Sequence, residues 1–284
     1  ELNYGANNVD ADPIRWADHS IREAQRQQIK LEGDLRHAVS EKALVLFYQP
    51  VIDLISGEMA GAEALLRWPL PDGQAPIGPD KFIPLAEQLG LMDELGGQGF
   101  EDACLQLRRW QELPGNAAFW VSVNVAPTQL RNPSLADRFI AITQATGVAP
   151  ACIKLEITEN ALDVDLSEIN TVIDELVAAG FSLALDDFGT GYSSLGRLIN
   201  MPFTLFKVDK AFVWQIPDGR GAGVVASLSH LSHQLKFDAL GEGVETAAQE
   251  AYLRDLNYRY AQGYYYAKPM SAADFTAWAG WPID

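Results

Sequence analysis

Acidic and amide side chains recur at or near the ends of short apolar runs along this 284-residue sequence. If these runs are parallel strands of a closed barrel, their carboxyl ends meet at one rim and the side chains converge there. Converging carboxylates repel one another and lose solvation, which is costly unless cations compensate them. The pattern therefore predicts a cation site built from Glu63, Asn124, Glu156, Asp186, Asp187 and Glu242.

These side chains are hard oxygen donors, and no His or Cys cluster accompanies them in the sequence. Such donors favour Mg²⁺, Mn²⁺ or Ca²⁺ over zinc. The set suffices for two ions, and the adjacent Asp186 and Asp187 are suited to bridging or flanking both. Two ions would clamp the attacking and leaving oxygens of an in-line phosphoryl displacement. The alternative for each acid is a simple cap on the helix that follows its strand.

Lys207 lies inside the apolar run Leu205-Phe206-Lys207-Val208. An ammonium at such a position is costly unless it faces the acidic rim. From there it would orient a water molecule or neutralise charge that develops on a phosphate. The competing interpretation is that Lys207 only pairs with a neighbouring acid such as Asp209.

Short apolar runs alternate with longer amphipathic ones, which is typical of β/α units around a parallel sheet. The first two runs are joined by a turn at 53–57 that is too short for a crossover, so they are expected to form an antiparallel hairpin. We therefore predict an α/β fold, a modified TIM-type (β/α)8 barrel with an antiparallel first strand. Strands are expected at Leu44–Val51, Met59–Trp68, Ala118–Val125, Ile153–Ile157, Ser182–Asp186, Leu205–Val208, Phe237–Gly241 and Tyr258–Tyr264. Helices are expected at Ala17–Val39, Pro84–Trp110, Ser134–Thr146, Leu166–Ala179, Ser193–Leu198, Gly223–Leu235, Ala247–Leu256 and Ala272–Ala279.

The length of the chain fits one barrel, because about 250 residues is the usual size of this fold. Residues 1–30 are expected to be an N-terminal connector and helix from an upstream region, and residues 31–284 to be the barrel. An alternative is that the N-terminal helix plugs one end of the barrel. Cys104 and Cys152 lie in apolar stretches, which favours buried free thiols and a cytoplasmic location.

Charge and hydropathy limit the class of partner. Lys and Arg number 21 against 38 Asp and Glu, for a formal net charge of −17, so a long nucleic acid is not an expected partner. A small phosphorylated ligand remains compatible, because bound divalent cations would reverse the local charge. No apolar run approaches the roughly 18 residues of a membrane span, so no membrane contact is expected from this segment. A longer protein that contains it could still be membrane-anchored.

Eight short motifs occur in a specific order between about Leu35 and Met270. Together they resemble the EAL family of cyclic di-GMP phosphodiesterases, and the resemblance does not depend on the Glu-Ala-Leu tripeptide alone. The motifs are Tyr48-Gln49-Pro50, Glu63-Ala64-Leu65-Leu66-Arg67-Trp68, Ser122-Val123-Asn124, Leu155-Glu156-Ile157-Thr158-Glu159, the run from Asp186 to Leu195, Phe206-Lys207-Val208-Asp209, Glu242-Gly243-Val244-Glu245-Thr246 and Gln262-Gly263-Tyr264.

The resemblance implies specific roles for residues of these motifs. The metal ligands would be Glu63, Asn124, Glu156, Asp186 and Asp187, with Glu242 completing the surroundings of the second ion. Catalysis would rest on Glu63, Asp186, Asp187, Glu242 and Lys207. Of these, Lys207 would contact the hydrolytic water. Substrate contacts would come from Gln49, Arg67, Asp209, Gln262 and Tyr264, with Arg67 on a phosphate. Glu159 would anchor the loop after Asp187, in which Gly189 and Gly191 are natural hinges and which borders a homodimer surface.

The activity that the resemblance implies is hydrolysis of cyclic di-GMP to linear pGpG with two Mg²⁺ or Mn²⁺ ions, with Ca²⁺ inhibitory and an upstream regulatory domain in the full-length chain. One alternative is a receptor that binds cyclic di-GMP without cutting it. Another is a barrel metalloenzyme of a different class that stabilises an enolate with Mg²⁺ and a lysine. Three departures from the usual family pattern are Gly241, where alanine is common, Asn160, where Ser or Thr is usual, and Lys268, where arginine is frequent.

Overall fold

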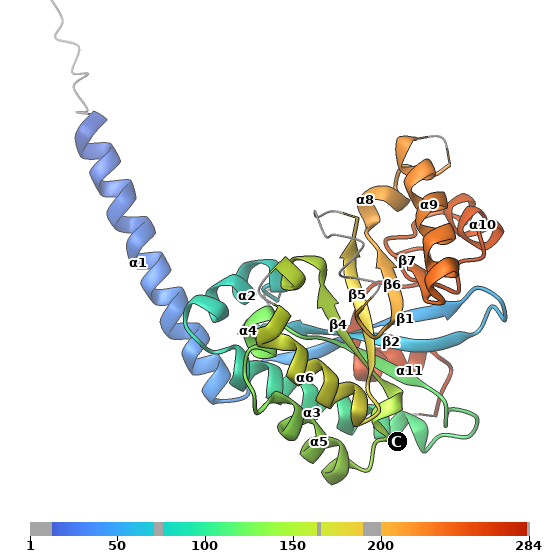
Figure 1. Cartoon of the computed structure of the whole chain (residues 1–284). Coiled ribbons are helices and arrows are strands. Elements are labelled where there is room, and N and C mark those ends of the chain that lie inside the picture. The colour runs from blue at the N-terminus through green and yellow to red at the C-terminus, as the bar shows by residue number, and fades with distance from the viewer. Residues whose placement is uncertain (1–12, 71–75, 164–165, 190–199, 218, 283–284) are drawn as a thin grey trace, which may run out of the picture.

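The structure is a computed structural model that describes residues 13–70, 76–163, 166–189, 200–217 and 219–282. Strands form a closed barrel with helices packed around it (Figure 1). The strands are β1 Val45–Asp53, β2 Met59–Arg67, β3 Trp120–Asn124, β4 Ile153–Thr158, β5 Ser182–Phe188, β6 Phe203–Val208, β7 Asp238–Gly241, β8 Tyr260–Ala261 and β9 Met270–Ser271. The helices are α1 Pro13–Ser40, α2 Pro79–Gln88, α3 Met92–Gln111, α4 Pro127–Leu130, α5 Leu135–Thr146, α6 Leu166–Ala178, α8 Lys210–Val213, α9 Arg220–Leu235, α10 Ala247–Asp255 and α11 Ala272–Trp278, with 3-10 turns η2 Pro150–Cys152 and η3 Glu159–Asp163.

The sheet confirms the predicted fold class. Its order is β2-β3-β4-β5-β6-β7-β8-β1, and β1 pairs back with β2 to close the barrel. Neighbours from β2 to β8 run parallel, whereas β1 is antiparallel to β2, β8 and the short β9. The result is a TIM-type barrel with an irregular start.

The β1–β2 hairpin places the first polar side chains of the rim. Asp53 fixes its turn, because Oδ1 accepts hydrogen bonds from the backbone N–H groups of Ile55 (2.8 Å) and Ser56 (3.2 Å). The register pairs Gln49 with Glu63. Directly opposed residues of an antiparallel pair project to the same face, so both side chains enter the barrel together.

The parallel strands carry the other candidate residues to the same rim. In register, Asn124 lies beside Glu156, and Thr158 lies beside Asp186. Residues two positions earlier on a strand share its face but lie one layer deeper. That deeper layer is apolar: Ala184, Leu205 and Leu240 precede Asp186, Lys207 and Glu242 by two residues and belong to one buried cluster with Val51 and Trp120. The acidic rim therefore rests on a floor that excludes water.

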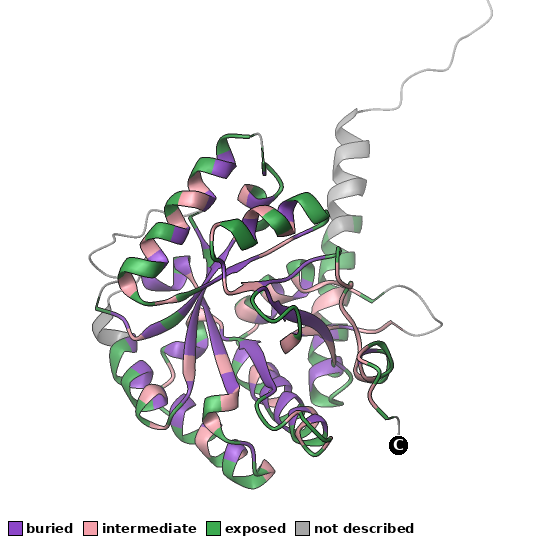
Figure 2. Ribbon diagram, turned by 90° about the vertical axis from the view of Figure 1, so that its right-hand side faces the viewer, coloured by how far each residue is buried: buried purple, intermediate pink, exposed green. Residues whose placement is uncertain are grey.

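A larger apolar core lies between the strands and the surrounding helices, where the buried faces of α3, α5 and α6 meet the sheet (Figure 2). Its centre includes Phe100 of α3 and Phe139 of α5, whose rings stack with centroids 3.8 Å apart. Trp110 extends the core toward α11 through contact with Phe275. This packing holds the strand ends, and with them the rim, in fixed positions.

Three element predictions need correction or qualification. The single helix predicted at Pro84–Trp110 is wrong: α2 and α3 are separate, and Gly90 between them has φ +68°, the left-handed conformation that ends helices. The predicted eighth strand shortens to β8, and β9 was not predicted. The helix predicted at Ser193–Leu198 lies outside the described residues.

Helix α1 continues without a break through residue 30 and leaves the barrel at its N-terminal end (Figure 1). Its last turns belong to the protein core, where Leu35 and Val39 pack in one cluster with Phe82 and Leu95. Ile29, six residues before Leu35, is 68% exposed. None of the helices in the described part of the chain is long and apolar enough to cross a membrane.

Candidate active site

Lys207 is the centre of the acidic rim. Its Nζ lies 2.7 Å from Glu156 Oε2, 2.8 Å from Glu242 Oε1, 3.1 Å from Asp186 Oδ1 and 3.5 Å from Glu63 Oε2. The side chain is 1% exposed. Four carboxylates from four different strands or strand ends thus converge on one ammonium group. The interpretation of Lys207 as a partner of Asp209 alone does not account for this geometry.

The protonation of the rim follows from its burial and its excess of acid. Burial alone would lower the pKa of Lys207, but the surrounding carboxylates raise it well above its ordinary value, so the ammonium stays charged. Burial, reinforced by Glu63, raises the pKa of Glu156 well above its usual range. Burial also raises the pKa of Glu242 to about 8, against the opposing influence of Lys207. One monovalent cation therefore does not neutralise the rim.

Glu63 is held differently from its acidic neighbours. Burial favours its neutral form, but Lys207 and hydrogen bonds from two amides outweigh burial and lower its pKa. Asn124 Nδ2 donates to Glu63 Oε1 at 3.0 Å, and Gln262 Nε2 donates to Glu63 Oε2 at 2.7 Å. Gln262 Nε2 also donates to Gln49 Oε1 at 2.9 Å. Glu63 is thus fixed as a carboxylate by residues of three other strands or loops.

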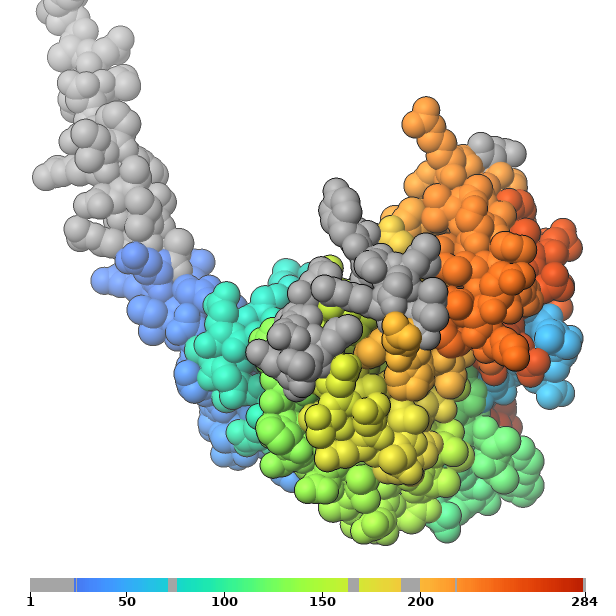
Figure 3. All heavy atoms as spheres, in the orientation of Figure 1, coloured from blue at the N-terminus to red at the C-terminus, as the bar shows by residue number. Residues whose placement is uncertain are grey.

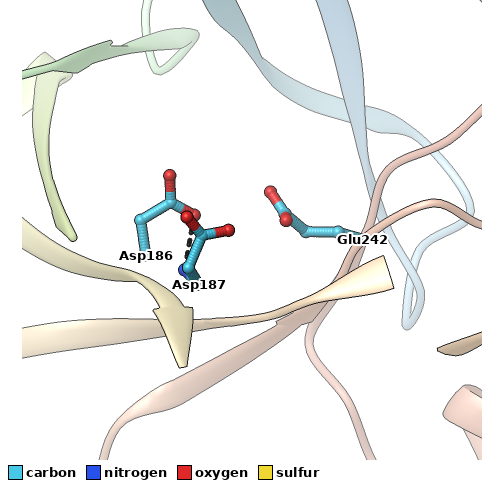
Figure 4. Close-up of side chains that lie close together, drawn as sticks. All are labelled: Asp186, Asp187 and Glu242. Carbon is cyan, nitrogen blue, oxygen red and sulfur yellow. Dashed lines mark hydrogen bonds between the residues drawn. The ribbon is translucent and has the colours of Figure 1, made fainter. Parts of the chain in front are cut away.

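Asp186, Asp187 and Glu242 form a tighter subgroup within the rim. One carboxylate oxygen from each lies within 4.8 Å of the others, and their carboxylates face a common space (Figure 4). Asp187 has φ +55°, an uncommon conformation for a non-glycine residue, and its backbone N–H donates to Asp186 Oδ1 at 3.0 Å. Burial, with Asp186 and Asp209 nearby, raises the pKa of Asp187. The pairing of β5 with β6 is irregular between Leu185 and Phe188, and this irregularity directs both aspartates into the same space.

This donor set fits hard divalent cations. Carboxylate oxygens are crowded within one cup, and three of the acids, Glu156, Asp187 and Glu242, have raised pKa values that mark negative charge without enough compensation. Such oxygens suit Mg²⁺, Mn²⁺ or Ca²⁺. Asp186, Asp187 and Glu242, whose carboxylate oxygens lie within 4.8 Å of one another, form a candidate acidic metal site.

Glu159 is positioned to hold the segment that follows Asp187. Its side chain is 3% exposed, and its Oε2 accepts a hydrogen bond from the backbone N–H of Gly189 at 3.0 Å. Gly189 has φ +99°, which glycine adopts without the strain that other residues would incur. The second predicted hinge, Gly191, lies outside the described residues.

The remaining predicted substrate residues lie around the rim and not in it. Arg67 and Tyr264 line a cavity of about 460 Å³ together with Gln49, Glu63, Glu242 and Gln262. A second cavity of about 660 Å³ reaches the rim from the side of α2 and α3. Asp209 is the N-cap of α8, where its Oδ1 accepts from the backbone N–H of Ala211 at 2.9 Å.

Sequence reasoning missed three residues that line the first cavity, namely Lys210, Trp214 and Glu245. Lys210 and Trp214 are one helical turn apart at α8, directly after Asp209. Phe212 and Val213 in the same run are apolar, which favours a helix packed on the core. The sequence therefore does not indicate that Lys210 and Trp214 line a cavity. Glu245 lies three residues after Glu242 in the motif Glu242-Gly243-Val244-Glu245-Thr246. Its place in this motif could have identified it as a candidate site residue.

The sequence profile described as "EAL domain" matches residues 32–269 of the chain. The chain belongs to the EAL family. Among curated relatives, this EAL domain is 36% identical over 248 residues to the Pseudomonas aeruginosa protein "Cyclic di-GMP phosphodiesterase NbdA", covering 87% of the chain and 31% of that protein. It is 35% identical over 276 residues to the P. aeruginosa protein "Bifunctional diguanylate cyclase/cyclic di-GMP phosphodiesterase MucR", covering 96% and 40%. The chain thus spans well under half the length of these relatives.

Solved structures agree with this EAL assignment. The PaMucR phosphodiesterase in complex with c-di-GMP superposes with a TM-score of 0.82 at 35% identity, covering 87% of this chain and 99% of that one. The EAL enzyme Bd1971 with cAMP and cyclic di-GMP bound gives a TM-score of 0.85 at 28% identity, covering 93% and 72%. Structural relatives of this EAL domain therefore include proteins that hold a cyclic dinucleotide.

Proposed function

We propose that this EAL domain hydrolyses cyclic di-GMP to linear pGpG with the help of two Mg²⁺ or Mn²⁺ ions. Water would add to one phosphorus atom, the bond from that phosphorus to the ribose 3′ oxygen would break, and the 3′ oxygen would leave as a hydroxyl. The observation that carries the proposal is the convergence of four carboxylates within 3.5 Å of Lys207 Nζ. Relatives described as cyclic di-GMP phosphodiesterases support the choice of substrate.

In this proposal the ions are held by Glu63, Asn124, Glu156, Asp186, Asp187 and Glu242. When bound, they would neutralise phosphate charge and lower the pKa of the attacking water. Lys207 and Glu242, whose Nζ and Oε1 atoms are 2.8 Å apart, would position that water at the phosphate. Arg67 would hold a phosphate oxygen from the wall of the adjoining cavity, which Gln49, Gln262 and Tyr264 also line. Asp209, at the start of α8, would contact the ligand from beside this cavity. Glu159 would keep the segment after Asp187 in place through Gly189.

The longer relatives also support a proposal on regulation. We expect an upstream domain to govern the barrel in the full-length protein, because MucR joins a cyclase and a phosphodiesterase activity in one chain. We further expect the barrel to act as a homodimer. Sedimentation of the chain with and without its first 30 residues measures this state, and a monomer in both forms would contradict it.

The direct test is an assay of the purified chain with cyclic di-GMP and either Mg²⁺, Mn²⁺, Ca²⁺ or EDTA, followed by chromatography. We expect pGpG with Mg²⁺ or Mn²⁺ and none with EDTA or Ca²⁺. Glu63→Gln keeps the size of the side chain but removes its charge, and it should lower turnover at least about 100-fold. Unchanged cyclic di-GMP in every condition would refute the hydrolase, and tight binding without turnover would instead support a receptor.

A further inference from the structure

The rim separates two cavities of different character. The aromatic lobe, of about 460 Å³, is walled by Arg67, Lys210, Trp214, Glu245, Tyr264 and Pro269. The apolar lobe, of about 660 Å³, is walled by Leu66, Ile83, Pro84, Met92, Val125 and Pro127. Both lobes reach Glu63, Lys210 and Glu242. Their flanking segments, α2–α3 in teal and α8–α9 in orange, lie on opposite sides of this face of the molecule (Figure 3).

A cyclic dinucleotide has two bases on either side of a ring of two phosphodiesters. With the scissile phosphate at the shared rim, one base is directed toward each lobe. The volumes are compatible, since ligand pockets commonly measure about 300–1,000 Å³. The two bases therefore meet different surroundings, although they are chemically identical.

Trp214 is a large aromatic side chain left half exposed, at 51%, on the wall of the aromatic lobe. Its only hydrogen-bond donor is already used, because Nε1 donates to the backbone oxygen of Gly243 at 3.0 Å. The rest of the indole is an apolar surface that faces a cavity. The ammonium of Lys210 lies 5.7 Å from the ring centroid, so a cation borders the same wall.

The indole is also held rigidly with respect to the rim. Gly243 follows Glu242 directly, with φ +66°, and a Cβ at this position would lie 2.4 Å from Cβ of Lys210. Helix α8 and the loop after β7 are therefore in close contact, and the hydrogen bond from Trp214 joins them. A rigid aromatic ring beside a reaction centre binds a planar ligand at a low cost in conformational entropy.

We propose that Trp214 is the stacking platform for one guanine base of the dinucleotide, the base that enters the aromatic lobe. This inference rests on the proposed function. Stacking of a base on an aromatic side chain is sequence-tolerant and strong enough to change affinity by roughly 5- to 150-fold. Lys210, on the same wall, is placed to contact the acceptor edge of the base or an adjoining phosphate.

The test compares substitutions that separate the ring from its N–H group. Trp214→Phe keeps an aromatic ring and loses the hydrogen bond to Gly243, whereas Trp214→Leu loses both. Trp278→Leu is the matched control, because Trp278 is 43% exposed on α11 and lines neither lobe. Affinity for cyclic di-GMP is measured by calorimetry with Ca²⁺ to prevent turnover, and binding is also followed by tryptophan fluorescence.

We expect Trp214→Leu to weaken binding by roughly 5- to 150-fold, and Trp214→Phe and Trp278→Leu to change it by less than about threefold. The ligand should quench fluorescence of the wild type, and Trp214→Phe should lose most of that quenching while it still binds. If Trp214→Leu does not fold, this loss of quenching carries the test. Equal affinities and equal quenching in all proteins would overturn stacking, and so would equal weakening by Phe and Leu, which would assign Trp214 a positioning role through Gly243. A wild type that neither binds nor cuts cyclic di-GMP would refute the proposed function itself.

Discussion

The Nζ atom of Lys207 lies 2.7 Å from Glu156 Oε2, and both side chains are 1% exposed. A buried ion pair contributes little net stability, but removal of one partner leaves an uncompensated charge in a water-poor environment. Here the loss would be compounded, because the same ammonium also lies within 3.5 Å of three more carboxylates. The pair is thus a structural element of the barrel, and in the proposed reaction it also takes part in the chemistry.

Lys207→Met should destabilise the metal-free protein by about 3–5 kcal/mol in the free energy of unfolding, because Glu156 and its neighbours lose their cation. Added Mn²⁺ should restore part of that loss by neutralising the same oxygens. Urea denaturation with EDTA and with Mn²⁺ measures both effects. Lys30→Ala, on the exposed part of α1, is the control and should stay within about 0.5 kcal/mol of the wild type. A Lys207→Met protein as stable as the wild type in EDTA would contradict this account.

Metal affinity should rise with pH. Burial raises the pKa of Glu242 to about 8, so below that pH a cation must displace its proton before the carboxylate can bind. Between about pH 6 and pH 8 the affinity for Mn²⁺ should therefore increase roughly tenfold per pH unit and then level off. Calorimetric titration across this range gives the profile. Glu242→Gln should bind more weakly and with a shallower dependence on pH, because Glu156 and Asp187, whose pKa values are also raised, still release protons when the cation binds. A flat profile for the wild type would be inconsistent with a proton on Glu242.

The sequence was sufficient to predict the barrel, its antiparallel first strand and the chain positions of the rim, because alternation of apolar runs is a strong signal. It did not reveal that Lys207 touches four carboxylates, since that depends on packing between strands far apart in the chain. The short strand β9 gives no periodic signal in two residues and exists only through its pairing with β1. Gly90 is a possible signal for the break between α2 and α3, because glycine often ends a helix. The apolar periodicity continues on both sides of it, and for that reason a single helix was predicted.

Trp214 shows a different limit of sequence reasoning. Its exposure arises because Phe212 and Val213 take the inner positions of α8 while Trp214 binds the loop after Glu242. Hydrophobic residues in a short run after a strand are ordinarily assigned to the core. Only the placement of α8 beside the rim distinguishes a lining residue from a packing residue.

Gly241 is fitted closely to Leu253 of α10. A Cβ on Gly241 would lie 2.4 Å from Leu253 Cδ1, so Gly241→Ala should destabilise the fold by about 1–3 kcal/mol. Leu253→Val should relieve part of the clash in the double variant. Gly223→Ala, in helix α9, is the control. No atom lies within 4 Å of a Cβ added to Gly223, so this substitution should be neutral or stabilising. Chemical denaturation of the wild type, the two single variants, the double variant and the Gly223→Ala control tests this, and an additive double variant would argue against direct contact.

Glu159 should matter for metal binding although it is not proposed as a ligand. Glu159→Ala removes the acceptor for the N–H of Gly189 and frees the segment that carries Asp187, so affinity for Mn²⁺ should fall by about 10- to 100-fold. Glu159→Gln retains an oxygen acceptor and should remain within about tenfold of the wild type. Calorimetry with Mn²⁺ distinguishes them, and equal losses in both variants would show that the charge of Glu159, and not its hydrogen bond, is what matters.

The proposed function requires that the rim hold a pair of divalent cations beside a scissile phosphate. The most direct measurement is a crystal structure with cyclic di-GMP and Mn²⁺, together with an anomalous difference map, using Glu63→Gln if turnover must be slowed. We predict two anomalous peaks about 3.5–4 Å apart, between Glu156, Asp186, Asp187 and Glu242, with a phosphate oxygen in contact with them. No anomalous peak at the rim, or a dinucleotide bound elsewhere on the barrel, would contradict the account.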